Sequence, residues 1–363
     1  MRKPLKDLAA ICAGQGAPQG DHNYCENGTP FVKAGNLQEL LEGKAITSIQ
    51  KVSDEVAKKH KLRLYPKGTI LFAKSGMSCI KGYIYVLPQS AYVVSHLACI
   101  TPNEDISEYL RYYFNYHKPN HLVKDAAYPS ISLSDVGNLV VDMKPESERN
   151  EIVSVLQHTE SIITLRQQQL QKLNELVKAR FVELFGDPVR NSMGLKTMPL
   201  GKACCLKAGI TTSADMIHEQ SNKFSIPCYG GNGIRGYVEL ATQCGCYPII
   251  GRQGALCGNV QLATGKFHAT EHAVLVTPLI ETNVIWLFYL LKMMDLYRFH
   301  TGAAQPGLAV KTLNTVDIPI ADVAAQHQFA AFVTQTDKSK VAIQKALDEA
   351  QLLFDSLMQK YFG

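Results

Sequence analysis

Two segments of the chain carry apolar residues at the spacing of a long coiled-coil helix. In residues 146–185 the apolar positions recur every seven residues, at Leu156, Ile163, Leu170, Val177 and Leu184. The alternate positions of the same seam are Thr159, Arg166, Leu173 and Arg180. Such spacing places a stripe along one side of a helix and favours pairing with another helix. Gly186-Asp187-Pro188 then ends the segment, as Gly and Pro do after helices.

A second segment, residues 323–363, continues the same heptad pattern. Polar residues at Arg166, Arg180 and Lys340 interrupt the seam and indicate either an antiparallel pair of defined register or contact with another subunit. Two ordinary amphipathic helices facing a core are the alternative, but about 40 residues at 1.5 Å rise give about 60 Å of helix, longer than one such domain needs. The predicted helix-pair or subunit interface comprises Leu156, Ile163, Leu170, Leu173, Val177, Leu184, Ile343, Leu347, Phe354, Leu357 and Tyr361.

The chain also contains an internal repeat. A shift of 177 residues places Phe185-Gly186 on Phe362-Gly363, and the register holds without a gap back to Pro129 and Pro306. Both copies read as an apolar strand led by Pro, a polar turn and a long helix. Two copies predict a pseudo-twofold molecule, which suits a partner with an approximate twofold axis such as duplex DNA.

The segments between the helices predict small domains rich in strands. Short β-like runs such as 68–72 and 82–87 alternate with Gly, Pro and Ser turns, and a helix is expected near 107–116. The second domain begins with a similar Pro-Leu run, and its segment 284–291 reads as a buried helix. We therefore predict an α+β protein with two mixed, β-rich domains. Their expected bounds are 1–145 and 189–322, separated by antiparallel coiled-coil helices at 146–188 and 323–363.

Composition limits the class of protein. A hydrophobic content of 46% and a charged content of 19% are typical of a globular chain. No stretch of about 18 apolar residues or signal peptide is evident, so no membrane role is expected. Ten cysteines without zinc spacing predict reduced thiols rather than a metal site, and hence a cytoplasmic protein. A net charge of +5 permits nucleic-acid binding without requiring it.

Several runs resemble a known family. Leu173–Pro188 is similar to the central conserved region of specificity subunits of type I restriction-modification systems. Tyr229–Gly236, Ile250–Gly254 and Thr270–Val276 resemble motifs of that family's target recognition domains. The resemblance covers the whole chain in the family's order of domains and helices. The first domain departs from it, since it has Ala73-Lys74-Ser75-Gly76 instead and lacks the Tyr-Gly-Gly-Asn-Gly run.

The resemblance implies a subunit that recognises DNA and performs no chemistry. Each domain would read one half of a split site in double-stranded DNA, while the helices set the spacing and dock two methyltransferase (modification) subunits. Half-sites about 34–36 Å apart lie on one DNA face. The complex can further include restriction or translocase subunits. This chain itself would bind no cofactor, because S-adenosylmethionine, ATP and Mg belong to the partner subunits.

The Gly-rich turns acquire a role in this setting, because backbone without a Cβ can approach phosphates while a neighbouring side chain reaches a base. Arg252 suits guanine, Gln253 or Asn232 suits adenine, and lysines suit phosphate. His96 and His272 form a matched pair that suits either the DNA face or the core. The alternative is that these turns merely connect strands. The candidate DNA-binding residues are Lys74, Ser75, Lys81, Tyr229, Asn232, Arg235, Arg252, Gln253, Asn259, Lys266 and His272.

The sequence contains no complete catalytic or nucleotide-binding motif. Gly231–Gly236 matches GxGxxG, but no helix pattern follows it and no acidic residue lies about 20 positions on. The sequence has no P-loop, no Asn-Pro-Pro-Tyr methylation motif and no nuclease-like carboxylate cluster. A scaffold that pairs its helices with other proteins and does not bind DNA is the competing hypothesis.

Overall fold

The computed structural model describes residues 1–302 and 306–363. The chain divides into two compact units, which we call unit 1 (residues 1–165 and 346–363) and unit 2 (residues 166–345). This division differs from the four segments expected from the sequence, because each unit combines one β-containing domain with a part of both long helices. Among the described residues, no helix has the length and apolarity needed to cross a membrane.

Unit 2 is built on a six-stranded sheet with the order β11-β16-β14-β15-β12-β13. In that order, its strands are Cys204–Ala208, Ala273–Pro278, Gln243–Gly251, Val260–Ala269, Ile226–Gly230 and Gly233–Val238. A separate ladder pairs β10 (Thr197–Pro199) with β17 (Asp317–Pro319). Helix α7 (Val284–Met293) contributes five buried side chains to the unit's core. Its start is fixed by Asn283, whose side chain accepts hydrogen bonds from the N–H groups of Ile285 and Trp286.

Unit 1 contains smaller sheets. A four-stranded sheet has the order β2-β8-β5-β6, with strands Ala9–Ala13, Leu97–Pro102, Ile70–Ala73 and Tyr85–Val86. A three-stranded sheet has the order β4-β3-β7, with strands Lys51–Val52, Thr29–Val32 and Tyr92–Val93. The ladder of β1 (Arg2–Pro4) with β9 (Val140–Asp142) corresponds to β10 with β17 in unit 2. The α-helices of its domain are α1 (Asn36–Leu41), α2 (Asp54–Lys59), α3 (Ser107–Tyr116) and α4 (Leu133–Gly137).

The repeat is longer in the structure than in the sequence. The 177-residue shift carries α3 onto α7, α4 onto α8 (Val310–Asn314), and β9 onto β17 with identical bounds. It therefore extends back to residue 107, where the sequence shows it only from Pro129. The first strands follow a shift of 195 residues instead, from β1 and β2 to β10 and β11. The 18-residue difference between these shifts lies in the middle of each domain, where the two units differ.

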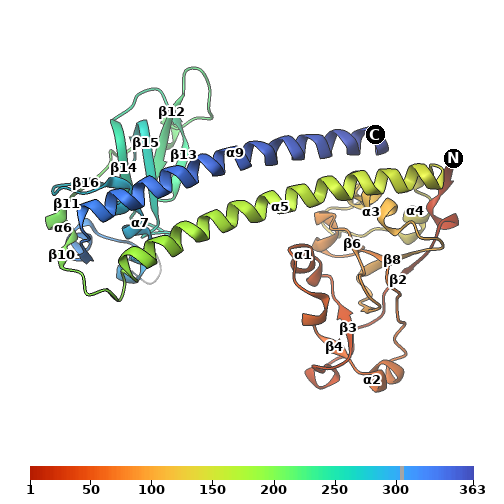
Figure 1. Ribbon diagram of the computed structural model, residues 1–363. Coiled ribbons are helices and arrows are strands. Elements are labelled where there is room, and N and C mark those ends of the chain that lie inside the picture. Colours follow the sequence, from red (N-terminus) through yellow and green to blue (C-terminus); the bar gives the residue numbers. More distant parts are fainter. Residues whose placement is uncertain (303–305) are drawn as a thin grey trace. The chain divides into compact units, whose positions relative to one another are not determined.

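Two helices of 40 residues confirm the expected long elements. Helix α5 spans Glu146–Phe185 and α9 spans Val323–Phe362 (Figure 1). Gly186, with φ of +73°, follows α5 and permits the left-handed turn that ends many helices. Every heptad position named for the two segments is buried or half-buried, including the polar Thr159 and Thr336. The predicted seam is therefore the covered face of each helix.

The two helices pack antiparallel. In unit 1 the beginning of α5 shares a core with the end of α9, since Ile152, Leu156, Met358 and Phe362 belong to one buried cluster. In unit 2 the end of α5 packs on the beginning of α9. There the rings of Phe181 and Phe329 meet edge to face at 5.4 Å. The α+β class with two mixed domains and a pair of long helices is thus confirmed.

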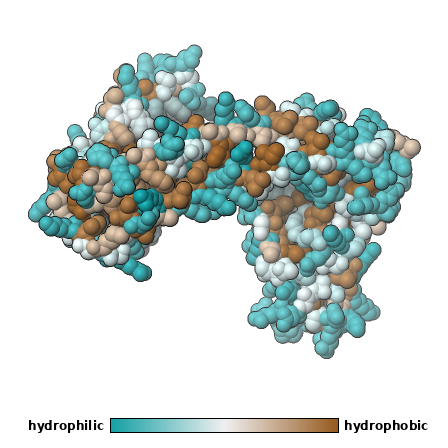
Figure 2. Space-filling view, in the orientation of Figure 1, coloured by the Kyte–Doolittle hydropathy of each residue, from teal (hydrophilic) through white to brown (hydrophobic). Residues whose placement is uncertain are grey.

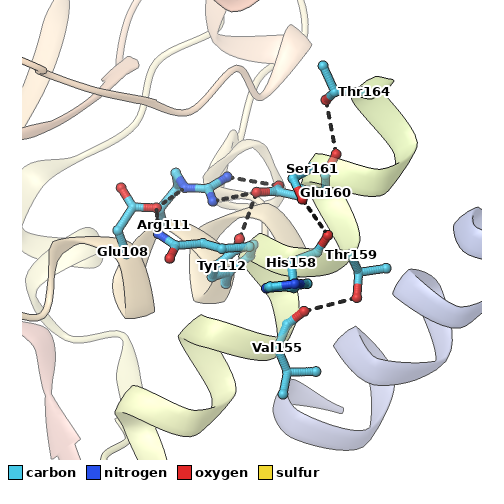
Figure 3. A network of polar contacts seen from close by, with 10 residues as sticks. Glu108, Arg111, Tyr112, Val155, His158, Thr159, Glu160, Ser161 and Thr164 are labelled. Carbon is cyan, nitrogen blue, oxygen red and sulfur yellow. Dashed lines mark hydrogen bonds and ion pairs between the residues drawn. The ribbon is translucent and has the colours of Figure 1, made fainter. Parts of the chain in front are cut away.

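A polar network also fastens α3 to α5 in unit 1 (Figure 3). The Arg111 guanidinium donates to both carboxylate oxygens of Glu160, at 3.0 and 2.7 Å, and to Glu108 at 2.7 Å. The Tyr112 hydroxyl donates to Glu160 at 2.7 Å. Burial lowers the pKa of Arg111, but the hydrogen bonds and charge of Glu160 outweigh it and leave this pKa raised. In unit 2 the corresponding α7 position is the apolar Phe288.

Truncating the contact between α5 and α9 should destabilise the unit that contains the truncated residue. We expect Phe181→Ala to lower the free energy of unfolding of unit 2 by about 3–5 kcal/mol, because Phe181 is fully buried among aromatic rings. The measurement is urea unfolding followed by fluorescence of Trp286, the single tryptophan, which lies in unit 2 beside Phe185. The neighbouring exposed Val182→Ala is the control and should change stability by less than about 0.5 kcal/mol. Equal effects of both variants would contradict the packing of Phe181 between the two helices.

Candidate nucleic-acid interface

The turn that follows β14 is fixed by its backbone. The N–H of Arg252 donates to the carbonyl of His272 at 3.0 Å, and the carbonyl of Arg252 accepts from Leu308 at 2.8 Å. The N–H of Gly254 donates to Pro306 at 2.9 Å. The Arg252 side chain is half-buried and Gln253 is exposed. Two neighbouring segments therefore hold this turn without using its side chains.

A close approach of two glycines joins this turn to the β12–β13 turn. A Cβ on Gly251 would overlap the carbonyl oxygen of Gly231. In the other direction, a Cβ on Gly231 would lie 3.2 Å from the carbonyl oxygen of His272 and 3.7 Å from that of Gln253. Position 251 therefore requires a residue without a side chain, and position 231 leaves little room for one. The contact brings three turns of unit 2 together, at residues 231–232, 251–259 and 270–272.

Two amide side chains meet between these turns. The Nδ2 of Asn259 donates to the Oδ1 of Asn232 at 2.6 Å. Asn232 is exposed, and Asn259 is half-buried. The backbone of Asn259 is held in turn, because its carbonyl accepts from Gly251 at 2.9 Å. The structure thus brings Asn232, Arg252, Gln253, Asn259 and His272 together, as five of the residues chosen from the sequence.

Unit 1 contains the same turn after β5. The N–H of Lys74 donates to His96 at 2.9 Å, and the carbonyl of Lys74 accepts from Ile131 at 2.7 Å. The N–H of Gly76 donates to Pro129 at 3.0 Å. Each bond has its counterpart at the Arg252 turn. Lys74 and Ser75 therefore occupy the positions of Arg252 and Gln253, and Lys81 occupies that of Asn259.

The strand beside the turn is also repeated. Strand β3 runs parallel to β7 as β12 runs parallel to β15, so Val32 takes the place of Tyr229. After this strand the units diverge, because α1 follows β3 whereas β13 follows β12. In unit 1 the Nζ of Lys81 donates to the Oε1 of Gln38, on α1, at 3.4 Å. In both units, a side chain near the turn thus donates to an amide oxygen on the segment that follows β3 or β12, Lys81 to Gln38 in unit 1 and Asn259 to Asn232 in unit 2.

The matched histidines lie beside these turns and have different partners. The Nδ1 of His96 lies 2.8 Å from the Oγ of Ser75, and the Nε2 of His272 lies 3.0 Å from a carboxylate oxygen of Glu271. The pKa of Glu271 is lowered overall. Burial alone would raise it, but hydrogen bonds from the N–H groups of Glu271 and Thr212, together with the charges of His272 and Arg235, have the larger effect. Glu271 therefore stays ionised next to His272.

Buried polar atoms without a partner concentrate at this place. Among the described residues, four buried side-chain nitrogen or oxygen atoms have no hydrogen-bond partner in the chain. Three of them belong to the turns of unit 2, namely Arg252 Nε, Thr270 Oγ1 and His272 Nδ1. Buried polar groups are normally satisfied, so this concentration marks a place suited to an external partner.

Other candidates chosen from the sequence lie elsewhere in unit 2. Lys266 lines a surface hollow of about 540 Å³ with Glu239 and Thr242, which no residue of the Arg252 turn lines. The ring of Tyr229 is half-buried and packs edge to face on Phe267 at 5.6 Å. Burial raises the pKa of Tyr229. The side chain of Arg235 covers Gly230, next to the three turns.

The sequence reasoning omitted two residues of these clusters. Glu271 stands inside the quoted Thr270–Val276 run, so its position beside His272 was a usable signal. Gln38 carried no signal, because only the fold brings α1 to the β5 turn. Among the described residues, no group of three or more His, Cys, Asp or Glu side chains could hold a metal ion.

The fold and these paired turns define a duplicated α+β protein that presents one equivalent polar surface turn in each unit. Residues 1–175 and 196–351 match the family described as the type I restriction modification DNA specificity domain. The chain therefore belongs to this family, and the resemblance inferred from its motifs is confirmed.

Individual relatives match shorter segments. The chain is 41% identical over 143 residues to the type I restriction enzyme EcoprrI specificity subunit of Escherichia coli, covering 39% of this chain and 36% of that protein. It is 27% identical over 193 residues to the MjaIX specificity subunit of Methanocaldococcus jannaschii, covering 51% and 43%. The matched segments thus span less than half the length of either relative.

Solved structures extend the fold comparison to the whole chain. The crystal structure of a type I restriction-modification S subunit from M. genitalium aligns with a TM-score of 0.67 at 14% identity, covering 100% of this chain and 96% of that one. A structure concerned with complex assembly and conformational transition of the type I R-M system aligns with a TM-score of 0.59 at 15% identity, covering 100% and 97%. At this identity the agreement establishes the fold.

The glycine contact predicts a sensitive position. We expect Gly251→Ala to lower the free energy of unfolding of unit 2 by about 1–3 kcal/mol, because the new Cβ must displace Gly231. The readout is urea unfolding followed by Trp286 fluorescence. Gly307→Ala is the matched control, since the nearest atoms to its Cβ would lie at 3.8 and 4.0 Å. A harmless Gly251→Ala would show that the turns are not locked together.

Proposed function

We propose that this chain is the DNA-recognition subunit of a type I restriction-modification complex, located in the cytoplasm and without catalytic activity of its own. Each unit would read one half of a split site in double-stranded DNA. The observation that carries the proposal is the repeated turn, whose backbone bonds are the same in both units while its side chains, Lys74 and Ser75 in one and Arg252 and Gln253 in the other, differ. Such an arrangement suits two half-sites of different sequence.

The chemistry of the turn residues fits the edges of bases and the phosphates. Arg252 can donate twice to guanine. Gln253 and Asn232 offer the donor and acceptor that adenine requires. Lys74, with Lys81, fits phosphate oxygens in unit 1, and Lys266 does so in unit 2. Ser75, Tyr229, Arg235 and His272 remain candidate contacts around these residues.

The outer surfaces of the long helices suit the proposed methyltransferase subunits. Apolar side chains stand exposed there, visible as brown atoms along the helices in Figure 2. In unit 1 these are Ile162, Leu165, Leu352 and Leu353, and in unit 2 Leu176, Val182 and Val341. Exposed apolar groups beyond those used in the seam favour contact with other proteins. S-adenosylmethionine, ATP and Mg would bind to those partner subunits and not to this chain.

The proposal is tested with the chain assembled with its methyltransferase subunits. The complex is incubated with random-sequence duplexes, and the bound molecules are sequenced across a salt series. We expect one split motif and a steep loss of affinity with salt. A protein scaffold without a DNA role would enrich no motif.

Single substitutions should separate base reading from phosphate binding. We expect Arg252→Ala to cost about 1–3 kcal/mol and to relax preference at one position of one half-site. Lys266→Ala should weaken all duplexes alike and reduce the salt slope by about one unit. Both are measured by equilibrium binding to the selected motif and its single-base variants. A uniform loss for Arg252→Ala would reassign it to phosphate.

The helix pair should set the distance between half-sites. Inserting seven residues after Gln168 in α5 and after Ala342 in α9 keeps the seam in register, because each site lies thirteen residues from the Phe181–Phe329 contact. About 10 Å of added helix should lengthen the spacer of the selected motif by about three base pairs, or abolish the motif if the accompanying rotation of one half-site by roughly 100° is not absorbed. Insertion in α5 alone breaks the register and should abolish the motif. An unchanged spacer after the double insertion would contradict the proposal that the helix pair sets the distance between half-sites.

A further inference from the structure

The Asn259–Asn232 contact leaves a defined set of hydrogen-bonding groups exposed. Asn259 donates through Nδ2, so the Oδ1 of Asn232 is the accepting atom of the 2.6 Å bond. An amide oxygen has two lone pairs and an amide nitrogen two hydrogens. Asn232 therefore retains one lone pair and both N–H groups, and its amide can turn over only if the amide of Asn259 turns over with it.

Resting on the proposed function, we infer that Asn259 is a positioning residue which orients Asn232 to read an adenine in the half-site of unit 2. Adenine presents the N7 acceptor and the N6 donor in the major groove. The oriented Asn232 amide offers its Nδ2 to N7 and its remaining Oδ1 lone pair to N6. The reversed amide would present these groups in the wrong order.

The backbone supports this assignment, because Asn259 is hydrogen-bonded through its backbone and Asn232 follows a glycine in close contact with Gly251. The N–H of Asn259 donates to Leu256 at 3.1 Å, and its carbonyl accepts from Gly251 at 2.9 Å. Asn232 follows Gly231, whose carbonyl lies against Gly251. The amide bond thus joins two turns that are already in contact.

Unit 1 supplies an independent parallel. Lys81 occupies the place of Asn259, five residues after the turn glycine, and its Nζ donates to the Oε1 of Gln38. The donors differ, and the amides come from unrelated elements, α1 and the β12–β13 turn. The same type of link in two unlike settings favours a functional role over a chance surface contact.

The test uses the complex with its methyltransferase subunits and four duplexes that differ only at the candidate adenine of the selected motif. We expect Asn232→Ala to abolish the preference for adenine. Asn259→Asp removes the donor and presents a second acceptor, so the Asn232 amide should reverse. We expect the adenine preference to fall about ten- to a hundredfold while total binding changes less.

Matched variants separate orientation from charge and folding. Asn314→Asp, on α8, adds the same charge outside the three turns and should leave the preference unchanged. Asn259→Ala removes the donor without adding charge and should reduce the preference severalfold. In an Asn232→Ala background, Asn259→Asp should produce no further loss of base preference, because Asn259 acts only through Asn232.

Two failures are distinguishable. If the wild-type complex selects no motif, the proposed function fails. If it selects a split motif but the folded Asn259→Asp and Asn259→Ala variants keep the full preference for adenine, Asn259 does not orient Asn232 and only this inference is overturned. Additive losses in the double variant would also overturn it, since they would show that Asn259 acts independently.

Discussion

Packing of α5 against α9 is the constraint on which both units depend. Unit 1 does not complete its core from one continuous stretch of chain, and the core of unit 2 joins the end of α5 to the beginning of α9. In unit 1 the core requires Met358 and Phe362 from the far end of the sequence, and in unit 2 it joins Val177 and Phe181 to Phe329. Each domain therefore shares its core with parts of both long helices, and the contacts that stabilise the domain also hold the two helices together in that unit.

The two domains share a common backbone framework and differ in the segment that lies in its middle. The first strands, the turn after β5 or β14, and everything from α3 or α7 onward have counterparts of matching position. Between them, α1 in one unit stands where β13 stands in the other, and this region accounts for the 18-residue difference. The framework holds the turns in place, while the inserted segment decides which side chain meets them, Gln38 or Asn232.

Elements with strong periodicity were predictable, and contacts between elements were not. The heptads located both long helices, because an apolar stripe that repeats over 40 residues fits a long packed helix and few other structures. Sequence comparison between the halves showed the repeat only from Pro129, since α3 and α7 share position and burial rather than residues. Gly-rich turns pointed to Arg252 and Asn232, but the meeting of Gly231 with Gly251 depends on the sheet. Lys266 was chosen with Arg252 as a candidate DNA-binding residue because of its charge. The fold places it in a surface hollow that no residue of the Arg252 turn lines.

The way the turn is held explains how its side chains can differ between units. All three bonds that fix Arg252 and Gly254 run between backbone atoms, and the same is true at Lys74 and Gly76. Backbone hydrogen bonds do not require a particular side chain, so the same support of the turn is compatible with different residues at 74, 75, 252 or 253. Gly251 is different, because its missing side chain is itself part of the support. The domain thus separates residues that maintain the turn from residues that it presents, and only the second group can change without loss of this support.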